Sequence, residues 1–362
     1  MPPLGLTGLL TLALAASAGH PAPSGLELVA PDGARPVSGD VPFLVRSAGP
    51  LRRVAFAVDG WVLDVDRRAP FGYGRDGVLD TGTLTAGPHR LSARVEIGGR
   101  TITLARTIRV AATAARPQSR PAWSDEFTGP AGRPPDRHKW GYAIGRWGRT
   151  AGELQTYTNR TANAALDGAG HLRIVARRQA AGGAAYTSAR IHTLDRFEPR
   201  FGRIEARIKV PAGRGLLPAF WLLGGDQGGA TEWPASGEID VMEVVGQDPF
   251  GYQGTVHGPQ AGAPTRDVED ARMARSRAPY SDGFHVYAVE WRAGSIRFLV
   301  DGQPVGDPLT PAAYASLGGR WVFTRPFYLV LNVAVGNEWT GPPDATTSWP
   351  AVMLVDWVRA YR

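Results

Sequence analysis

The segment Phe327–Val335 constrains the fold of this chain more than any other part of the sequence, because it is apolar at every position except Asn332. Alternate side chains of a β-strand point to opposite faces of the sheet, so a strand that is apolar on both faces must be covered on both. We therefore expect Phe327–Val335 to lie in the middle of a sheet.

Other segments in the C-terminal two thirds of the chain also have the patterns of strands. Residues Arg203–Val210 alternate charged and apolar side chains, which is typical of a strand with one buried face. Further strands are expected at Phe284–Trp291 and Ser295–Val300. The only candidates for helices are Asp267–Ala274 and Pro311–Leu317. An all-β domain of this size fits two stacked antiparallel sheets, as in a jelly roll.

The composition excludes several classes of protein. The chain has no cysteine, which rules out disulfides, zinc ribbons, iron–sulfur clusters and a catalytic thiol. Lys and Arg number 40 against 33 Asp and Glu, and the net charge of +7 is spread along the chain without a basic run. So thin an excess gives no basis for nucleic-acid binding, and we expect no nucleic-acid partner.

The first residues predict export. Leu4–Ala15 is an apolar run that is too short to span a membrane, and Ala16-Ser17-Ala18 places small residues at a cleavage site before Gly19. We interpret residues 1–18 as a secretory signal peptide and expect a secreted protein, although no Lys or Arg precedes the apolar run. No other stretch of the sequence is long and apolar enough to cross a membrane.

Residues 25–112 have the pattern of a separate, small β-sandwich. Short strands end at turn signals such as Asp59-Gly60 and Gly98-Gly99, and the stretch resembles the immunoglobulin-like modules attached to bacterial secreted enzymes. We expect a spacer or stability role for this module, with Trp61 as the one aromatic side chain that could contact a ligand. A polar, Pro-containing linker at 113–122 would join it to one domain at 123–362.

The most informative stretch, GEIDVME, carries two glutamates and one aspartate between aliphatic residues. On a regular strand Glu238 and Asp240 share a face with Met242, while Glu243 points into the core, where an unpaired carboxylate is costly. One extra residue, a β-bulge near Val241-Met242, would return Glu243 to the acidic face. We therefore expect a bulge at this place.

Two closely spaced carboxyl groups suit the retaining hydrolysis of a glycosidic bond. Glu238 and Glu243 would be about four strand steps apart, and side chains that lean inward would bring their carboxyls to about 5–6 Å. In such a pair one ionised carboxylate attacks the anomeric carbon and one protonated carboxyl donates to the leaving oxygen. Asp240 can hydrogen-bond the nucleophile, and the crowded charges hold one proton on the cluster. An exposed acidic strand edge and a calcium site are alternative interpretations.

A series of motifs runs in order through the C-terminal part of the chain. These motifs are WSDEFTG (123–129), GELQTYT (152–158), GRIEARIKVPAGRGLLPAFWLLG (202–224), WPASGEIDVMEVVG (233–246), TVHG (255–258), FHVYAVEW (284–291), LNVAVGN (331–337) and VDWVRAY (355–361). In them the chain resembles the family-16 glycoside hydrolases, and most closely the bacterial laminarinase-like branch, the endo-β-1,3-glucanases. The E-x-D-x-x-E motif of that family is the bulged form, in agreement with the argument from strand parity.

The resemblance implies a β-jelly roll whose concave face forms an open cleft, and the endo-hydrolysis of a β-linked glucan with retention. It implies that Glu238 is the nucleophile, Asp240 its helper and Glu243 the general acid/base, with no cofactor needed. A monomer acting on a polysaccharide is expected. Two alternatives stay open: the same scaffold acting on another β-linked polysaccharide or as a transglycosylase, and a non-catalytic glucan-binding protein.

Further residues match positions in the substrate cleft of that family or lie where a sugar could reach them. Sugar rings stack on aromatic faces, and polar groups fix their orientation. The candidates are Trp233, His257, Trp147, Trp221, Arg190, Asn163 and Asn332. Trp147 lies in a Gly-rich loop, where core burial is not expected. Core packing is the alternative for Trp221, and a lone histidine is otherwise more often structural.

Many members of the family hold one Ca²⁺ ion on the convex face. The matching positions here are the side chain of Asp356 and the backbone carbonyls of Glu126 and Gly168. Since Ca²⁺ takes six or more oxygen ligands, waters would have to supply the rest. Such an ion would be structural, with no part in catalysis.

Overall fold

The computed structural model describes residues 25–73, 77–81, 84, 87–97, 99–111, 120–148, 151–225 and 231–362. The expected signal peptide at 1–18 lies outside these residues, as do most of the linker, the turn residue Gly98 and the side chain of Trp61. The expectations made for them stay predictions.

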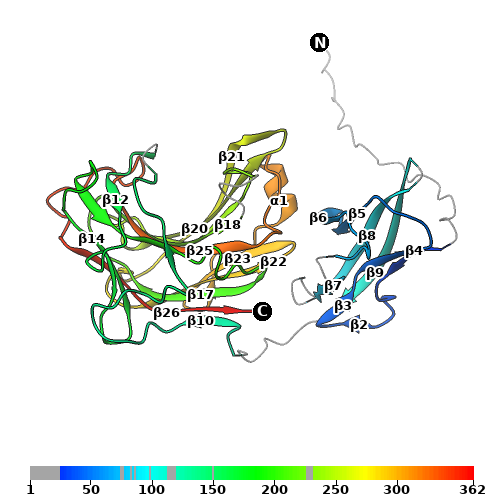
Figure 1. Ribbon diagram of the computed structural model, residues 1–362, viewed down its shortest axis with the longest axis horizontal. Helices are drawn as coiled ribbons and strands as arrows, with labels where there is room; N and C mark the ends of the chain where they lie inside the picture. Colours follow the sequence, from blue (N-terminus) through cyan, green and yellow to red (C-terminus); the bar gives the residue numbers. More distant parts are fainter. Residues whose placement is uncertain are drawn as a thin grey trace, which may run out of the picture.

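Two large sheets make up the part of the chain that follows the linker (Figure 1). Across the described residues, the first sheet has seven strands in the order β11-β16-β25-β18-β19-β20-β21. Their bounds are β11 Gly141–Tyr142, β16 Arg190–His192, β18 Leu216–Gly224, β19 Glu238–Glu243, β20 Gly251–Gln260, β21 Ala263–Arg275 and β25 Phe327–Val335. Each strand of this sheet pairs antiparallel with its neighbours.

The second sheet has the order β13-β14-β26-β17-β22-β23-β24, and β10 also pairs with β26. Its strands are β10 Trp123–Asp125, β13 Ala164–Leu166, β14 Leu172–Ala176, β17 Gly202–Lys209, β22 His285–Arg292, β23 Ser295–Val300, β24 Gln303–Pro304 and β26 Ala351–Tyr361. A short parallel pair, β12 (Gln155–Tyr157) and β15 (Tyr186–Ser188), belongs to neither sheet. Apolar side chains of both large sheets form one buried cluster, for example Ile204 with Leu331. The expected jelly roll of two stacked sheets is confirmed.

Strand β25 lies inside its sheet, as the apolar run predicts. All nine of its residues are buried, and β16 and β18 pair with it from either side. Leu329 and Leu331 face the core between the sheets. Tyr328 and Val330 alternate with them and form a small separate cluster with Leu223. The strand is therefore apolar on both faces because both are covered.

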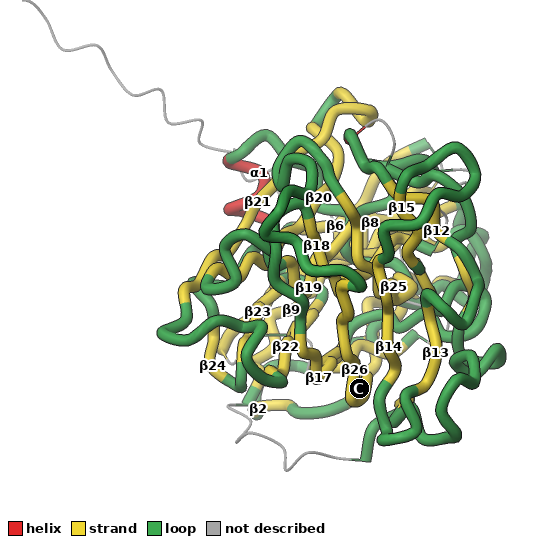
Figure 2. The backbone as a smooth tube through the Cα atoms, turned by 90° about the vertical axis from the view of Figure 1, so that its left-hand side faces the viewer, coloured by secondary structure: helices red, strands yellow, loops and turns green. Residues whose placement is uncertain are grey.

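The described chain has one α-helix, and it is short. The expected helix at 311–317 is present as α1 (Pro311–Ser316), where the Thr310 side chain accepts a hydrogen bond from the Ala313 amide at 3.2 Å. The helix lies beside β21 in Figures 1 and 2, and the Tyr314 hydroxyl donates to the Val268 carbonyl. No described helix has the length and apolar character needed to cross a membrane.

The second helix candidate, Asp267–Ala274, is wrong. This segment belongs to β21 and pairs antiparallel with β20, with Val268 opposite Gly258 and Ala274 opposite Tyr252. Its charged residues suit the exposed edge of a sheet as well as a helix surface, so the local pattern does not decide between them. Pairing with a neighbouring strand does.

The residues before the linker form a second set of strands. The largest sheet has the order β2-β9-β8-β5-β6, and β1-β4 and β3-β7 are two-stranded pairs. The strands are β1 Leu26–Val29, β2 Pro36–Val37, β3 Asp40–Pro42, β4 Leu44–Ser47, β5 Arg53–Val58, β6 Trp61–Asp66, β7 Val78–Asp80, β8 Gly87–Ile97 and β9 Arg100–Val110. Their buried side chains, such as Phe43 and Phe56, form a core of their own. The immunoglobulin-like identity of this unit stays a prediction.

The two cores meet at a small contact. Ala293, in the turn between β22 and β23, is fully buried within the N-terminal cluster, and Phe201 packs against both clusters. The Arg200 guanidinium lies 5.2 Å from the Tyr73 ring centroid. The Arg292 side chain donates to the Leu84 carbonyl at 3.0 Å. The N-terminal unit therefore rests on the start of β17 and the β22–β23 turn.

Replacing Leu331 by alanine should destabilise the protein strongly. The side chain is fully buried between the sheets, so Leu331→Ala leaves a cavity and should lower the free energy of unfolding by about 2–5 kcal/mol. Leu317→Ala removes the same atoms from a residue that is 54% exposed, and its effect should stay within about 0.5 kcal/mol. Denaturant unfolding followed by tryptophan fluorescence measures both. Equal losses would contradict the central place of β25.

Candidate active site

Strand β19 carries one extra residue relative to its neighbours. Against β18, Asp240 pairs with Trp221 and Met242 pairs with Phe220, which leaves Val241 as the extra residue. The pairing of β19 with β20 shifts at the same place. Two residues that oppose one define a β-bulge. The bulge predicted from the parity of the acidic motif is confirmed.

The bulge separates the apolar from the acidic side chains of β19. Ile239 and Met242 are fully buried in the core between the sheets. Without the bulge, Met242 would share a face with Asp240. The Asp240 carboxyl instead interacts with those of both Glu238 and Glu243. The three acidic side chains therefore lie together on the face away from the core.

The strand register arranges these carboxyls in three rows across the sheet. From β18 through β19 to β20, the rows are Leu223–Glu238–His257, Trp221–Asp240–Thr255 and Ala219–Glu243–Gln253. The third row continues through Asn332 on β25 to Arg190 on β16. The acidic cluster therefore lies between His257 on one side and Arg190 on the other.

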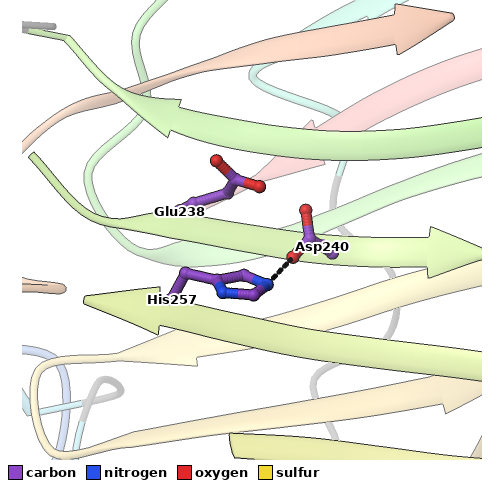
Figure 3. A group of neighbouring side chains, drawn as sticks. All are labelled: Glu238, Asp240 and His257. Carbon is purple, nitrogen blue, oxygen red and sulfur yellow. Dashed lines mark ion pairs between the residues drawn. The ribbon is translucent and has the colours of Figure 1, made fainter. Parts of the chain in front are cut away.

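His257 lies between two carboxyl groups. Its Nδ1 is 2.7 Å from Asp267 Oδ2, and its Nε2 is 3.4 Å from Asp240 Oδ2. Figure 3 shows Glu238 and Asp240 projecting from β19 on the side where His257 projects from the neighbouring strand. Burial disfavours the charged imidazole, but the hydrogen bond to Asp267 and the charge of Glu238 outweigh it and raise the pKa of His257 to about 9. His257 is therefore positively charged at neutral pH.

Burial raises the pKa of all three acidic side chains. For Glu243, burial and the charge of Glu238 outweigh the opposing charge of His257, and the pKa rises to about 7. Burial and the two glutamates hold the pKa of Asp240 well above its ordinary value. Burial also raises the pKa of Glu238, but the charges of His257 and Arg190 oppose the increase. The cluster can thus offer an ionised carboxylate and a proton donor at one pH.

Arg190 lies among the expected cleft residues. Its guanidinium carbon is 4.5 Å from the Trp221 ring centroid and 5.7 Å from that of Trp147. The Trp221 indole donates to Asn332 Oδ1 at 2.7 Å, and Asn332 Nδ2 lies 3.3 Å from the Tyr157 hydroxyl. Asn332 is buried, so its contacts orient Trp221 and Tyr157. The structure brings Arg190, Trp147, Trp221 and Asn332 together.

Two tryptophans of the site are partly exposed. Trp233 precedes β19 and is 42% exposed, and its ring centroid is 6.2 Å from that of His257. Trp147 is 50% exposed and lies on the side of Arg190. Aromatic faces of this kind can stack on sugar rings. They lie on opposite sides of the acidic rows.

Asn163 does not join this group. It is fully buried, and its Nδ2 donates to the Val175 carbonyl at 2.8 Å and to Thr187 Oγ1 at 3.0 Å. Its Oδ1 accepts from Thr158 Oγ1 at 2.7 Å. The side-chain amide of Asn163 therefore forms hydrogen bonds inside the protein, which link the start of β13 to β14 and β15. The expectation that Asn163 binds substrate is not supported by this placement.

Comparison with known proteins identifies the family. Residues 151–359 match the family described as Glycosyl hydrolases family 16. The chain belongs to this family. It is therefore a glycoside hydrolase, and the jelly roll of two stacked sheets is the fold that it shares with its relatives.

Several relatives are similar over the C-terminal two thirds of the chain. A β-glucanase of Rhodothermus marinus is 38% identical over 258 residues, which cover 66% of this chain and 84% of the relative. Glucan endo-1,3-beta-glucosidase A1 of Niallia circulans is 35% identical over 261 residues, which cover 66% of this chain and only 37% of the relative. The laminarinase catalytic domain of Thermotoga maritima has a TM-score of 0.59 at 38% identity, covering 67% of this chain and 98% of that domain.

Three further side chains, those of Glu153, Gln155 and Tyr157, also lie at the site of this family-16 hydrolase. Tyr157 and Gln155 both donate hydrogen bonds to the Glu153 carboxylate. Burial raises the pKa of Glu153, although Gln155 and Arg190 oppose the increase. The three side chains occupy alternate positions of the GELQTYT motif, in and just before β12, and that two-residue period could have revealed them. Asp267 was missed because its segment was expected to be helical.

Two groups of side chains in this hydrolase could be considered for a metal ion. In the described part of the chain, Glu238, Asp240 and His257 are the one set of three acidic or histidine residues whose ligand atoms lie within 4.8 Å of one another. The ring nitrogens of His257 face Asp267 at 2.7 Å and Asp240 at 3.4 Å, so a metal ion would have to displace these ion pairs. The Asp356 carboxylate accepts a hydrogen bond from Arg207 at 2.5 Å, so a Ca²⁺ ion would compete with a guanidinium. Asp356 therefore fits the ion poorly.

Removing the acidic charge of Glu243 should stabilise the hydrolase at alkaline pH. Glu243 keeps its proton to about pH 7 when folded but has an ordinary pKa of 4.5. The folded state thus binds more protons in this window, and stability falls as pH rises through it. Glu243→Gln should raise the free energy of unfolding at pH 8 by roughly 1–3 kcal/mol, with no gain at about pH 4.

Thermal and denaturant unfolding at the two pH values measure this effect. Glu338→Gln makes the same substitution at an exposed position and serves as the control. A gain for Glu243→Gln that is equal at both pH values would show that burial does not raise the pKa of this carboxyl.

Proposed function

We propose that the protein is a secreted, endo-acting hydrolase that cleaves β-1,3-glucan with retention of the anomeric configuration. The observation that carries the proposal is the bulged strand β19, which gathers Glu238, Asp240 and Glu243 on one face beside His257. The names of the relatives support it, since they include a glucan endo-1,3-beta-glucosidase and a laminarinase.

In the first step of the proposed reaction, the Glu238 carboxylate attacks the anomeric carbon while the Glu243 carboxyl gives its proton to the glycosidic oxygen. The carbon–oxygen bond to the leaving sugar breaks, and a covalent glycosyl–enzyme forms. In the second step, the Glu243 carboxylate takes a proton from water, and the water oxygen displaces Glu238. Asp240 hydrogen-bonds Glu238 and orients it. The raised pKa of Glu243, about 7, suits a group that must both give and take a proton.

The face of the sheet around the cluster, with its two partly exposed tryptophans, supports a polymeric substrate. Trp233 and Trp147 expose rings on opposite sides of the carboxyls, where successive sugar units could stack. Arg190 adds a hydrogen-bond donor on the side of Trp147. A polymer that lies across such a face is cut within its length, in keeping with endo-action.

Hydrolysis of a panel of polysaccharides tests the substrate. We expect laminarin to be cut to oligosaccharides of several lengths, with the β-anomer released first, as followed by proton NMR. Release of the α-anomer first would contradict retention. Hydrolysis of galactan or of mixed-linkage glucan, with laminarin left intact, would contradict the β-1,3-glucan assignment and support the alternative substrates.

Glu238→Gln should lower kcat on laminarin by at least about 1,000-fold, because the amide cannot form the covalent intermediate. Binding to laminarin should persist in affinity electrophoresis. Glu290→Gln, on β22 of the other sheet, is the matched control and should keep the parent activity. A Glu238→Gln variant that hydrolyses laminarin as fast as the parent would rule out this nucleophile. If the parent protein itself bound laminarin without cutting it, the glucan-binding alternative would hold.

We also propose that the chain is exported and cleaved after Ala18. The support is the apolar run followed by small residues in the sequence. Mass spectrometry of the protein from the culture medium of a bacterial host should find Gly19 at the amino terminus. Retention in the cells with Met1 intact would contradict this proposal.

We further propose the domain limits expected from the sequence: an immunoglobulin-like module at 25–112, a linker at 113–122 and the catalytic domain at 123–362, acting as a monomer. The contacts of Arg200 with Tyr73 and of Arg292 with Leu84 support a spacer or stability role for the module. Calcium binding at Asp356, Glu126 and Gly168 is not part of the proposal, because Arg207 occupies the Asp356 carboxylate.

A further inference from the structure

Asp267 on β21 contacts the charged histidine of the site. Its Oδ2 lies 2.7 Å from His257 Nδ1, where the His257 side chain is 19% exposed and the Asp267 side chain, on the exposed edge strand, is 27% exposed. A carboxylate at this distance accepts a proton-bearing Nδ1, and the contact fixes the orientation of the ring. The other ring nitrogen then points its N–H toward Asp240.

The Asp240 oxygen that faces this N–H lacks a hydrogen-bond donor in the described part of the chain. Asp240 Oδ2 is buried and has no hydrogen-bond partner among the described side chains and backbone groups. His257 Nε2 lies 3.4 Å away, which is close enough for an ion pair. A small movement of the imidazole, or of Asp240 when substrate binds, would close this distance to a hydrogen bond. Asp267 therefore acts on the cluster through His257.

The groups around His257 are mostly acidic. Those that face it are Glu238, Asp240 and Glu243 on β19, Asp267 and Glu269 on β21, and the ring of Trp233. Arg190 is the other positive charge that acts on Glu238. The positive charge of the imidazolium therefore offsets the negative charge of several carboxyls. That positive charge depends on the hydrogen bond from His257 to Asp267.

We propose that Asp267 is a positioning residue, which holds His257 protonated with Nε2 toward Asp240 and so supplies the positive charge that the crowded nucleophile needs. The inference rests on the proposed hydrolysis. His257 keeps its proton through both steps, and Asp267 touches no reacting atom. The side chain works by fixing the charge and direction of its neighbour.

The test compares Asp267→Asn with two other variants in the full-length protein. Asp267→Asn keeps the shape of the side chain but removes the charge that favours the imidazolium. We expect the His257 titration midpoint, followed by NMR of the ring nitrogens, to fall from about 9 by at least about one pH unit. On laminarin kcat should fall about tenfold while KM stays within about twofold, since a charge-assisted hydrogen bond is lost away from the substrate.

Asp267→Glu restores the carboxylate and should recover the midpoint to within about half a pH unit. Asp270→Asn removes the same charge from the same strand, where Asp270 pairs with Arg272 at 2.6 Å, and should leave the midpoint and kcat unchanged. A purely structural role for Asp267 would alter stability without moving the midpoint.

An unchanged His257 midpoint in Asp267→Asn would overturn the proposal. So would an equal loss of kcat in Asp270→Asn, or a rise in KM at constant kcat, which would make Asp267 part of substrate binding. The NMR measurement needs no substrate, so it decides the role of Asp267 even if laminarin is not cut and the proposed function fails. If Asp267→Asn does not fold, a midpoint in Asp267→Glu that equals the parent value supports the proposal, and a loss of the ring's charge there overturns it.

Discussion

The two-residue period of a β-strand decides which side chains face the core and which face the site. Each strand of the seven-stranded sheet gives one face to the core, so polar groups for chemistry can occupy only alternate positions. Glu238 and Asp240 are two positions apart and share a face, but Glu243 is three positions after Asp240 and on a regular strand would point into the core. One extra residue at Val241 restores the phase, so that Met242 enters the core while Glu243 turns outward. The apolar core and the acidic cluster are compatible only because of that residue.

Much of this arrangement follows from local patterns. The burial of Phe327–Val335 and the bulge at Val241 could both be predicted, because each depends on the alternation of side chains along a single strand. Family motifs indicated Trp221 and Arg190, and the structure brings them together. Each of these predictions follows from the residues of a single segment, without knowing which strands pair with it.

Other features depend on contacts between segments and could not be read in this way. Residues 267–274 carry charges that suit a helix or a sheet edge, and only their pairing with β20 makes them a strand. Asn163 matches a polar cleft position by motif, but its amide is taken up by Val175 and Thr187 inside the protein. The partnership of Asp267 with His257 exists only once β20 and β21 are paired.

The strand that carries Asp267 has a single neighbour. Among the described strands β21 pairs only with β20, and most of its side chains are exposed or partly exposed. Substitutions on such an edge disturb the core little. Asp267, which influences the charge of the carboxyls through His257, thus lies on an edge strand, where a substitution costs little folding stability. A substitution on this edge strand would change the working acidity of the site while leaving Glu238, Asp240 and Glu243 themselves untouched.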